Sequence, residues 1–122
     1  MQKTLVFGAS LKPERYSNLV VHRLLDHNIV TEAFGLKSGK IRTVQIKSNL
    51  DDFQNIHTIT LYIGPSRQPE YYDEILNINP IRVIFNPGTE NPEFKQLLEN
   101  QGISVLEACT LVLLTTHQYL TK

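Results

Sequence analysis

Short runs of aliphatic and β-branched residues alternate along the chain with longer amphipathic segments. Five of these runs are typical of buried strands: residues 4–7, 29–34, 58–63, 82–85 and 103–106. The segment between Gly35 and Asn55 is less regular, and it indicates a short extra strand around residues 41–44 and a helical turn over residues 50–54. The pattern therefore predicts about five strands, each followed by a connecting segment.

Helix signals fill the spaces between the strands. Ser17 and Ser66 are placed to cap helices, and Asn91 precedes a proline and an acid, which suits the positive end of a helix dipole. Helix ends are expected at Asn28, Asn79-Pro80 and Gly102, and residues 110–120 predict a C-terminal helix. The residues expected to face the core are Val20, Val21, Leu24, Leu25, Tyr72, Ile75, Leu76, Phe94, Leu97 and Leu98.

Strands that alternate with helices imply parallel pairing, with helices on both faces of the sheet. The pattern predicts an α/β, Rossmann-like, doubly wound sheet of about five mainly parallel strands, in one domain over residues 1–122. Ligands of such folds bind outside the carboxyl ends of the strands. The candidate site residues are therefore those after each strand: Gly8-Ala9-Ser10, Gly35-Leu36-Lys37, Gly64-Pro65-Ser66, Asn86-Pro87-Gly88-Thr89 and Ala108-Cys109-Thr110.

Composition indicates an ordinary soluble protein. Hydrophobic residues make up 41% of the 122 and charged residues 20%, and no apolar run reaches the roughly 20 residues of a membrane helix. The N-terminus lacks a signal segment and the chain has one cysteine, so we expect a cytoplasmic protein without an internal disulfide. We expect no membrane partner.

The charge is zero overall but unevenly distributed. Residues 1–50 contain eight Lys and Arg against three acids, about +5, whereas the remaining residues contain four against nine, about −5. A neutral chain argues against a general nucleic-acid binder. The basic first half would attract a polyanion of modest size, and chance scatter over solvated surfaces is the alternative explanation.

The turn after the first strand has features of a phosphate site. Gly8 permits a tight turn, and Ala9 and Ser10 are small enough for a phosphate to approach backbone amides near a helix start. Arg15 and Ser17 follow closely and would both meet a pyrophosphate. The G-x-G-x-x-G fingerprint of dinucleotide-binding proteins is absent after its first glycine, and no Walker motif follows. A plain connecting turn is the alternative.

The end of the second strand bears on the choice of ligand. An NAD enzyme needs an acid there for the ribose hydroxyls, whereas this chain has Lys37, followed by Lys40 and Arg42. Cations at this place suit a phosphorylated ribose, as in NADP or coenzyme A (CoA). A solvated basic loop is the alternative.

Residues with catalytic potential are few. Cys109 is flanked by apolar residues and is best explained as a small buried hydrophobe. The histidines show no metal-ligand spacing, and a zinc site is not expected: His22, His27, His57 and His117. No catalytic constellation stands out, so the sequence favours binding over catalysis.

Four segments carry a resemblance to a known family: LVFGASLKPERYSNLVVHRLL, TLYIGPSRQPEYYDEIL, RVIFNPGTENPEF and VLEACTLVLL. Together they resemble the small stand-alone CoA-binding-domain proteins, which are similar to the N-terminal domain of the succinyl-CoA synthetase alpha subunit. The resemblance covers nearly the whole chain and implies a Rossmann-like domain with CoA across the carboxyl ends of its strands.

The resemblance also implies contacts at matching positions. The CoA phosphates would contact Gly8, Ala9, Ser10, Arg15, Tyr16 and Ser17. The adenosine would lie near Gly35 and Lys37; Ile63, Gly64 and Pro65 would line the nucleotide or pantetheine wall; and the pantetheine end would face Asn86, Pro87, Gly88 and Thr89.

In the synthetase, a second domain supplies a phosphorylated histidine and a partner subunit supplies the nucleotide site, and this sequence includes neither. The resemblance therefore implies a cytoplasmic module that binds CoA or an acyl-CoA without synthetase catalysis. Two alternatives stay open: an NADP-dependent oxidoreductase, and a regulatory or scaffold Rossmann domain that has lost its ligand. The acyl group, the protein partner and the oligomeric state are not specified.

Overall fold

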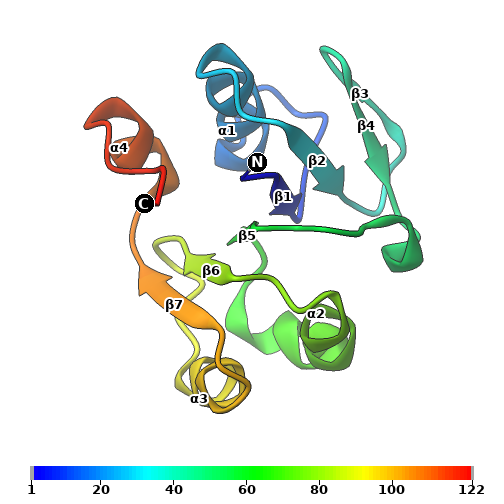
Figure 1. The fold of residues 1–122 in the computed structure, drawn as a ribbon. Coiled ribbons are helices and arrows are strands. Elements are labelled where there is room, and N and C mark those ends of the chain that lie inside the picture. Colours follow the sequence, from blue (N-terminus) through cyan, green and yellow to red (C-terminus); the bar gives the residue numbers. More distant parts are fainter. Residues whose placement is uncertain (1, 122) are drawn as a thin grey trace.

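The protein is built around a single β-sheet, seen in a computed structural model that describes residues 2–121. The sheet has seven strands in the order β3-β4-β2-β1-β5-β6-β7 (Figure 1). All neighbouring strands are parallel except β3 and β4. The strands are β1 (Thr4–Phe7), β2 (Thr31–Phe34), β3 (Gly39–Ile41), β4 (Val44–Lys47), β5 (Thr58–Leu61), β6 (Arg82–Phe85) and β7 (Ser104–Glu107). The predicted parallel α/β architecture is confirmed, but the expected number of about five strands was too low.

The two additional strands come from the segment in which one short strand was expected. Ile41 and Val44 are both buried, but they end β3 and begin β4 of an antiparallel hairpin instead of lying in one strand. Arg42, in the turn, has a φ of 53° and donates a hydrogen bond of 2.7 Å to Asp26. The hairpin is therefore tied to the first helix by an ion pair between residues far apart in sequence.

Helices cover both faces of the sheet, as the alternating pattern predicted. The helices are α1 (Tyr16–Asp26), α2 (Tyr72–Ile78), α3 (Pro92–Asn100) and α4 (Thr110–Thr115), with 3-10 turns η1 (Leu50–Asp52) and η2 (Pro65–Tyr71). The helices α1 and α4 lie on one side of the sheet, and α2 and α3 lie on the other (Figure 1). Side chains of α1 and α4 share one core cluster, and those of α2 and α3 share the other. The sheet lies between the two clusters, which leaves its carboxyl edge uncovered by helices.

Some of the predicted helix details were wrong. Ser17 lies inside α1 and Ser66 inside η2, and neither helix start has a side-chain cap. Asn91 is confirmed as a cap, because its Oδ1 accepts a hydrogen bond of 3.1 Å from the Phe94 amide. Leu97, expected in the core, is 37% exposed.

The C-terminal helix is shorter than expected. It ends at Thr115, and His117 follows with a φ of 58°. This turn brings Tyr119 back onto the sheet, where its ring lies 4.7 Å from the guanidinium of buried Arg82 and its carbonyl accepts from Arg82 Nη1 at 2.9 Å. An apolar pattern cannot distinguish a continued helix from a buried segment that turns back.

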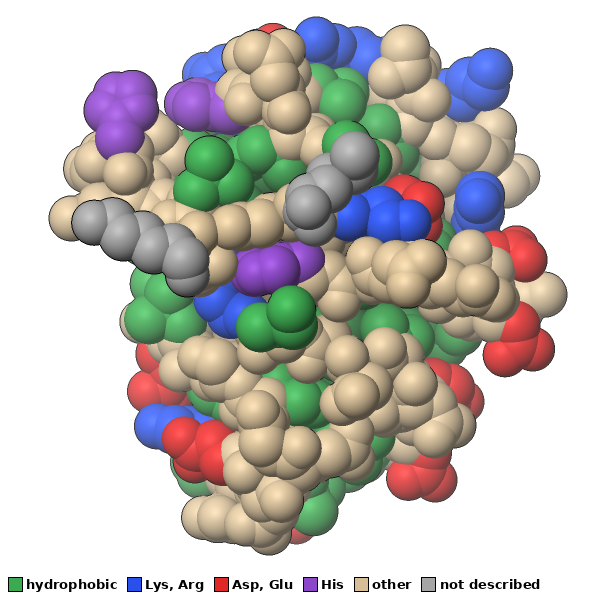
Figure 2. Space-filling view, viewed as in Figure 1, with side chains coloured by type: hydrophobic (Ala, Val, Ile, Leu, Met, Phe, Trp, Pro, Cys, Tyr) green, Lys and Arg blue, Asp and Glu red, His purple; other side chains and the backbone are tan. Residues whose placement is uncertain are grey.

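The uneven distribution of charge along the chain has a spatial counterpart. In Figure 2, basic side chains gather over the half of the molecule that contains α1 and the β3-β4 hairpin, and acidic side chains lie mainly over the half that contains α2 and α3. Residues 1–50 include β1 to β4, which lie together on one side of the sheet. The basic residues of this half of the sequence are therefore on one side of the molecule. Within residues 2–121, no helix combines the length and apolarity needed to cross a membrane.

Candidate ligand-binding cleft

A cleft of about 680 Å³ lies over the carboxyl ends of the central strands. It lies where β1 has β2 on one side and β5 on the other, which is the point at which the strand order reverses and at which doubly wound folds bind ligands. Its volume is within the usual range for small-molecule sites. Most of the predicted contact residues line it: Gly8, Ala9, Ser10, Arg15, Tyr16, Ser17, Gly35, Lys37, Ile63, Gly64, Pro87, Gly88 and Thr89.

Two predicted contact residues do not line the cleft. Pro65 begins η2 beside the cleft without lining it. Asn86 is 3% exposed, and its side chain is fully engaged in the protein. Its Nδ2 donates to Thr60 Oγ1 (2.8 Å) and the Leu61 carbonyl (2.9 Å), and its Oδ1 accepts from the Thr110 amide (2.9 Å). Asn86 therefore joins β5, β6 and α4 beneath the cleft.

The glycine turn after β1 forms the floor of the cleft. The amides of Gly8 and Ala9 both donate to the Phe34 carbonyl, at 2.9 and 2.8 Å, so neither is free for a phosphate. The amides of Tyr16 and Ser17, in the first turn of α1, have no acceptor in residues 2–121. The start of α1 therefore offers backbone donors to an anion, and in the predicted turn Gly8-Ala9-Ser10 only the Ser10 amide has no acceptor within the same residues.

Gly35 is required by the close approach of two strand ends. A Cβ atom at this position would lie 2.5 Å from the Ala9 carbonyl oxygen and 2.9 Å from a methyl group of Ile46. Because the first contact is with backbone, the clash cannot be relieved by a side-chain rotation. Gly35 lets the turn after β2 lie directly against the floor of the cleft.

Substitution of Gly35 by alanine is expected to lower the free energy of unfolding by about 1–3 kcal/mol, the usual cost of overpacking. Gly64 provides a matched control, because it lines the same cleft, has a φ of −66° and would bring its Cβ within 4 Å of no atom. Urea denaturation of the Gly35→Ala and Gly64→Ala variants measures both effects. Equal stability of the two variants would contradict the close approach.

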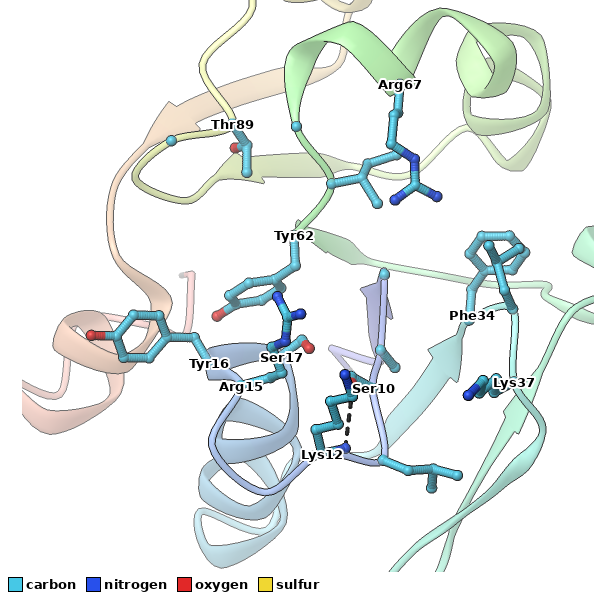
Figure 3. A pocket seen from close by; sticks show the side chains of 18 of the residues that line it. Ser10, Lys12, Arg15, Tyr16, Ser17, Phe34, Lys37, Tyr62, Arg67 and Thr89 are labelled. Atoms are coloured by element: carbon cyan, nitrogen blue, oxygen red, sulfur yellow. Dashed lines mark hydrogen bonds between the residues drawn. The ribbon is translucent and has the colours of Figure 1, made fainter.

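Four cationic side chains line the cleft and no acidic side chain does: Lys12, Arg15, Lys37 and Arg67. The ion pairs formed by residues 2–121 involve none of the four. Figure 3 shows that they come from three separate places: the segment before α1, the turn after β2, and η2. The cleft therefore carries an uncompensated positive charge.

The basic loop predicted after β2 contributes only one of its three cations. Lys37 lines the cleft, whereas Lys40 is exposed on β3 outside it and Arg42 pairs with Asp26. The hairpin turns the last two away from the strand ends. In their place Arg67, which the sequence did not single out, extends from η2 toward the β1 and β2 side of the cleft (Figure 3).

Apolar and aromatic residues complete the lining. Leu36, a candidate from the turn after β2, lines the cleft, and the lining residues that sequence reasoning missed are Leu11, Lys12, Phe34, Tyr62, Arg67 and Tyr71. Tyr71 contacts Phe7 and Phe34 edge-on, with ring centroids 5.3 and 5.5 Å apart. Burial raises the pKa of Tyr62, so its hydroxyl stays protonated at neutral pH. Phe34 is the last residue of β2 and Tyr62 follows the last residue of β5. Their positions at strand ends could have identified them, but the sequence search considered only small and turn-forming residues.

A buried amide network holds the two turns on the β5 and β6 side. Gln68 Nε2 donates to the carbonyls of Ile63 (2.9 Å) and Thr89 (2.8 Å), and its Oε1 accepts from Asn91 Nδ2 (2.9 Å). One side chain thus joins the turn after β5 to the turn after β6. This wall of the cleft is preorganised by contacts between residues about 20 positions apart.

The chemistry available in the cleft is that of anion recognition. Its lining includes tyrosine and serine hydroxyls, but no His, Cys, Asp or Glu. Cys109 is half-buried at the start of α4 and does not line the cleft. In the part of the chain that the structure describes, no group of three or more metal-ligating side chains comes together.

Comparison with known proteins gives a family and several similar folds. The family model described as "CoA binding domain" matches residues 2–115. A crystal structure titled as an uncharacterized protein is 39% identical, with a TM-score of 0.93 over 97% of this chain and 98% of that one. A Thermus thermophilus protein (21% identity, TM-score 0.85, 96% and 90% of the two chains) and a hypothetical protein from Pyrococcus horikoshii OT3 (25%, 0.79, 88% and 76%) share the fold. A search of curated proteins found no match.

Proposed function

The chain belongs to the CoA binding domain family, and from this premise we propose that it binds coenzyme A or an acyl-CoA in the cleft over β1, β2, β5 and β6. The observation that carries the proposal is the set of four cations without a carboxylate: Lys12, Arg15, Lys37 and Arg67. CoA brings roughly four negative charges, two from its pyrophosphate and up to two from its 3′-phosphate. The charge of the cleft therefore matches the charge of the ligand.

The geometry supports an orientation for the ligand. The amides of Tyr16 and Ser17 and the guanidinium of Arg15 suit the pyrophosphate at the start of α1. Lys37 and Arg67 flank the β1 and β2 side and suit the 3′-phosphate. The turn of Pro87, Gly88 and Thr89 is then left for the pantetheine arm.

Aromatic and apolar groups near Lys37 suit the adenine. Phe34, Leu36 and Tyr71 lie in the same part of the lining, and none of them brings a charge. A flat base can pack against such side chains without displacing an internal hydrogen bond. Together with the two cations, they form a subsite for a phosphorylated adenosine.

We propose binding without a reaction of the protein's own. Among the residue types that act as general acids or bases, the cleft lining offers only lysine and tyrosine, and it includes no His, Cys, Asp or Glu. The proposal places the protein in the cytoplasm, which its single cysteine fits. An NADP-dependent oxidoreductase is the second candidate, because the same cations suit a ribose phosphate in NADP.

Isothermal titration with CoA, dephospho-CoA, NADP and NAD tests the proposal. We expect CoA to bind and dephospho-CoA to bind at least about tenfold more weakly, since it lacks the phosphate facing Lys37 and Arg67. NAD should give the weakest binding. Absence of heat with CoA would overturn the proposal and favour a scaffold role, and tighter binding of NADP than of CoA would favour the oxidoreductase.

A further inference from the structure

The edge strand β7 is unlike the other parallel strands in its exposure. Every residue of β1, β5 and β6 is buried, whereas β7 has three exposed residues and a half-buried Val105. Figure 1 shows β7 at one margin of the sheet, between α3 and α4, with no described element beyond it. This margin is the side of the sheet that the fold leaves open.

The backbone of β7 presents unpaired hydrogen-bonding groups along this margin. The amides of Ser104 and Ala108 donate toward β6, to the carbonyls of Ile81 (3.0 Å) and Phe85 (3.1 Å). Successive residues of a strand direct their backbone groups to opposite sides, so those of Val105 and Glu107 point outward. Within residues 2–121, no hydrogen bond outside the sheet uses them.

Two of the features that protect edge strands, proline and lysine, are absent from β7. Natural edges are protected by proline, by charged residues and above all lysine, by bulges and by short length. The opposite edge, β3, has exposed Lys40, but β7 has neither a lysine nor a proline. Its single charge, Glu107, lies 3.9 Å from Lys95 of α3.

An exposed apolar side chain lies on the same edge. Leu106, in β7, is 37% exposed. Leu106 pairs in register with Ile84, whose side chain packs in the α1 and α4 core cluster, so Leu106 lies on the α4 face of the sheet. The open backbone groups are therefore bordered by apolar surface on this face.

We infer that β7 pairs antiparallel with β7 of a second copy of this chain, about a two-fold axis at Leu106. In this register, Val105 and Glu107 of each copy exchange both of their backbone hydrogen bonds with Glu107 and Val105 of the other. The two strands join the sheets of both copies into one sheet. The interface is isologous, as in most homodimers.

The side chains of β7 suit pairing with themselves. Each Glu107 lies opposite a Val105, so no two like charges face each other directly. The two Leu106 side chains meet at a non-hydrogen-bonded position, where cross-strand side chains come closest. An edge whose outward hydrogen-bonding groups match one another in antiparallel pairing, and whose single charge meets no like charge, suits a second copy of the chain.

The dimer leaves the ligand cleft unchanged. Antiparallel pairing directs the carboxyl ends of the two sheets in opposite directions, so each cleft is formed by one chain alone. Ligand binding and dimerisation are then independent, and the failure of either proposal does not affect the other.

Sedimentation equilibrium of the full chain over a range of micromolar concentrations tests the dimer. We expect the wild type to dimerise, and Leu106→Lys, which sets two cations against each other on the axis, to weaken the dimer at least about tenfold. Val30→Lys is the matched control, because Val30 is 43% exposed and precedes β2, away from β7; it should not change the dimer. A monomeric wild type, or a dimer that persists in the Leu106→Lys variant, would overturn the inference.

Hydrogen exchange on the wild-type protein tests the same edge without a substitution. The amides of Val105 and Glu107 should exchange more slowly as the protein concentration rises. The amide of exposed Lys40, on the opposite edge, should not change relative to its own dilute value. Exchange rates at Val105 and Glu107 that are independent of protein concentration would exclude pairing through β7, regardless of the sedimentation results for the variants.

Discussion

Replacing both Lys37 and Arg67 with alanine is expected to weaken CoA binding by about 100-fold or more. A hydrogen bond to a charged group contributes about 1.5–3 kcal/mol, which corresponds to tenfold or more for each cation. Neither cation forms an ion pair in residues 2–121, so its loss leaves no buried carboxylate behind. Isothermal titration at one fixed salt concentration measures the change.

The double variant also tests where the 3′-phosphate lies. If Lys37 and Arg67 hold this phosphate, the variant should bind CoA and dephospho-CoA with similar affinities, whereas the wild type prefers CoA. Lys40→Ala is the matched control, because Lys40 is an exposed cation of β3 outside the cleft. A double variant that still prefers CoA would place the 3′-phosphate elsewhere, and an equal loss of affinity in Lys40→Ala would point to a general charge effect.

Asn86→Ala is expected to lower the free energy of unfolding by about 3 kcal/mol. The substitution removes three buried hydrogen bonds and leaves the Leu61 carbonyl and the Thr110 amide without their partner. An unsatisfied buried group costs about 1–3 kcal/mol. Chemical denaturation followed by circular dichroism gives the value.

Asn100→Ala is the control for this substitution. Asn100 accepts one hydrogen bond of 2.8 Å from Gln96 on the exposed surface of α3, so its loss should change stability by less than about 0.5 kcal/mol. If Asn86→Ala were as mild as Asn100→Ala, Asn86 would not be the link between β5, β6 and α4 that the structure shows.

Much of the fold was predictable because the relevant signals are local. Apolar runs of β1, β5 and β6 stand between helix signals, and strands that alternate with helices pair in parallel. Asn91 has its capping role because a cap depends only on the residues that follow it. The β3-β4 hairpin was missed because Ile41 and Val44, which lie on either side of the turn, are close enough in the sequence to be assigned to one short strand.

The composition of the candidate site was predictable only in part. Turns that follow parallel strands necessarily meet at one edge of the sheet, and for this reason most of the expected residues line one cleft. Arg67 was missed because η2 was read as a helix capped by Ser66, a pattern that says nothing about which side chain faces the strand ends. Asn86 was misplaced because a polar residue in a turn can hydrogen-bond inward as readily as it can face a ligand.

The sequence by itself determined the parallel α/β architecture and the edge of the sheet at which the candidate cleft lies, since these depend on local periodicity and turn chemistry. Its resemblance to known sequences indicated the family. Only the tertiary structure decided which cations face the cleft. Lys37 faces it and Arg42 does not, because Arg42 pairs with Asp26, a residue 16 positions earlier in the chain. The positions of such side chains depend on contacts between distant segments, which no local pattern encodes.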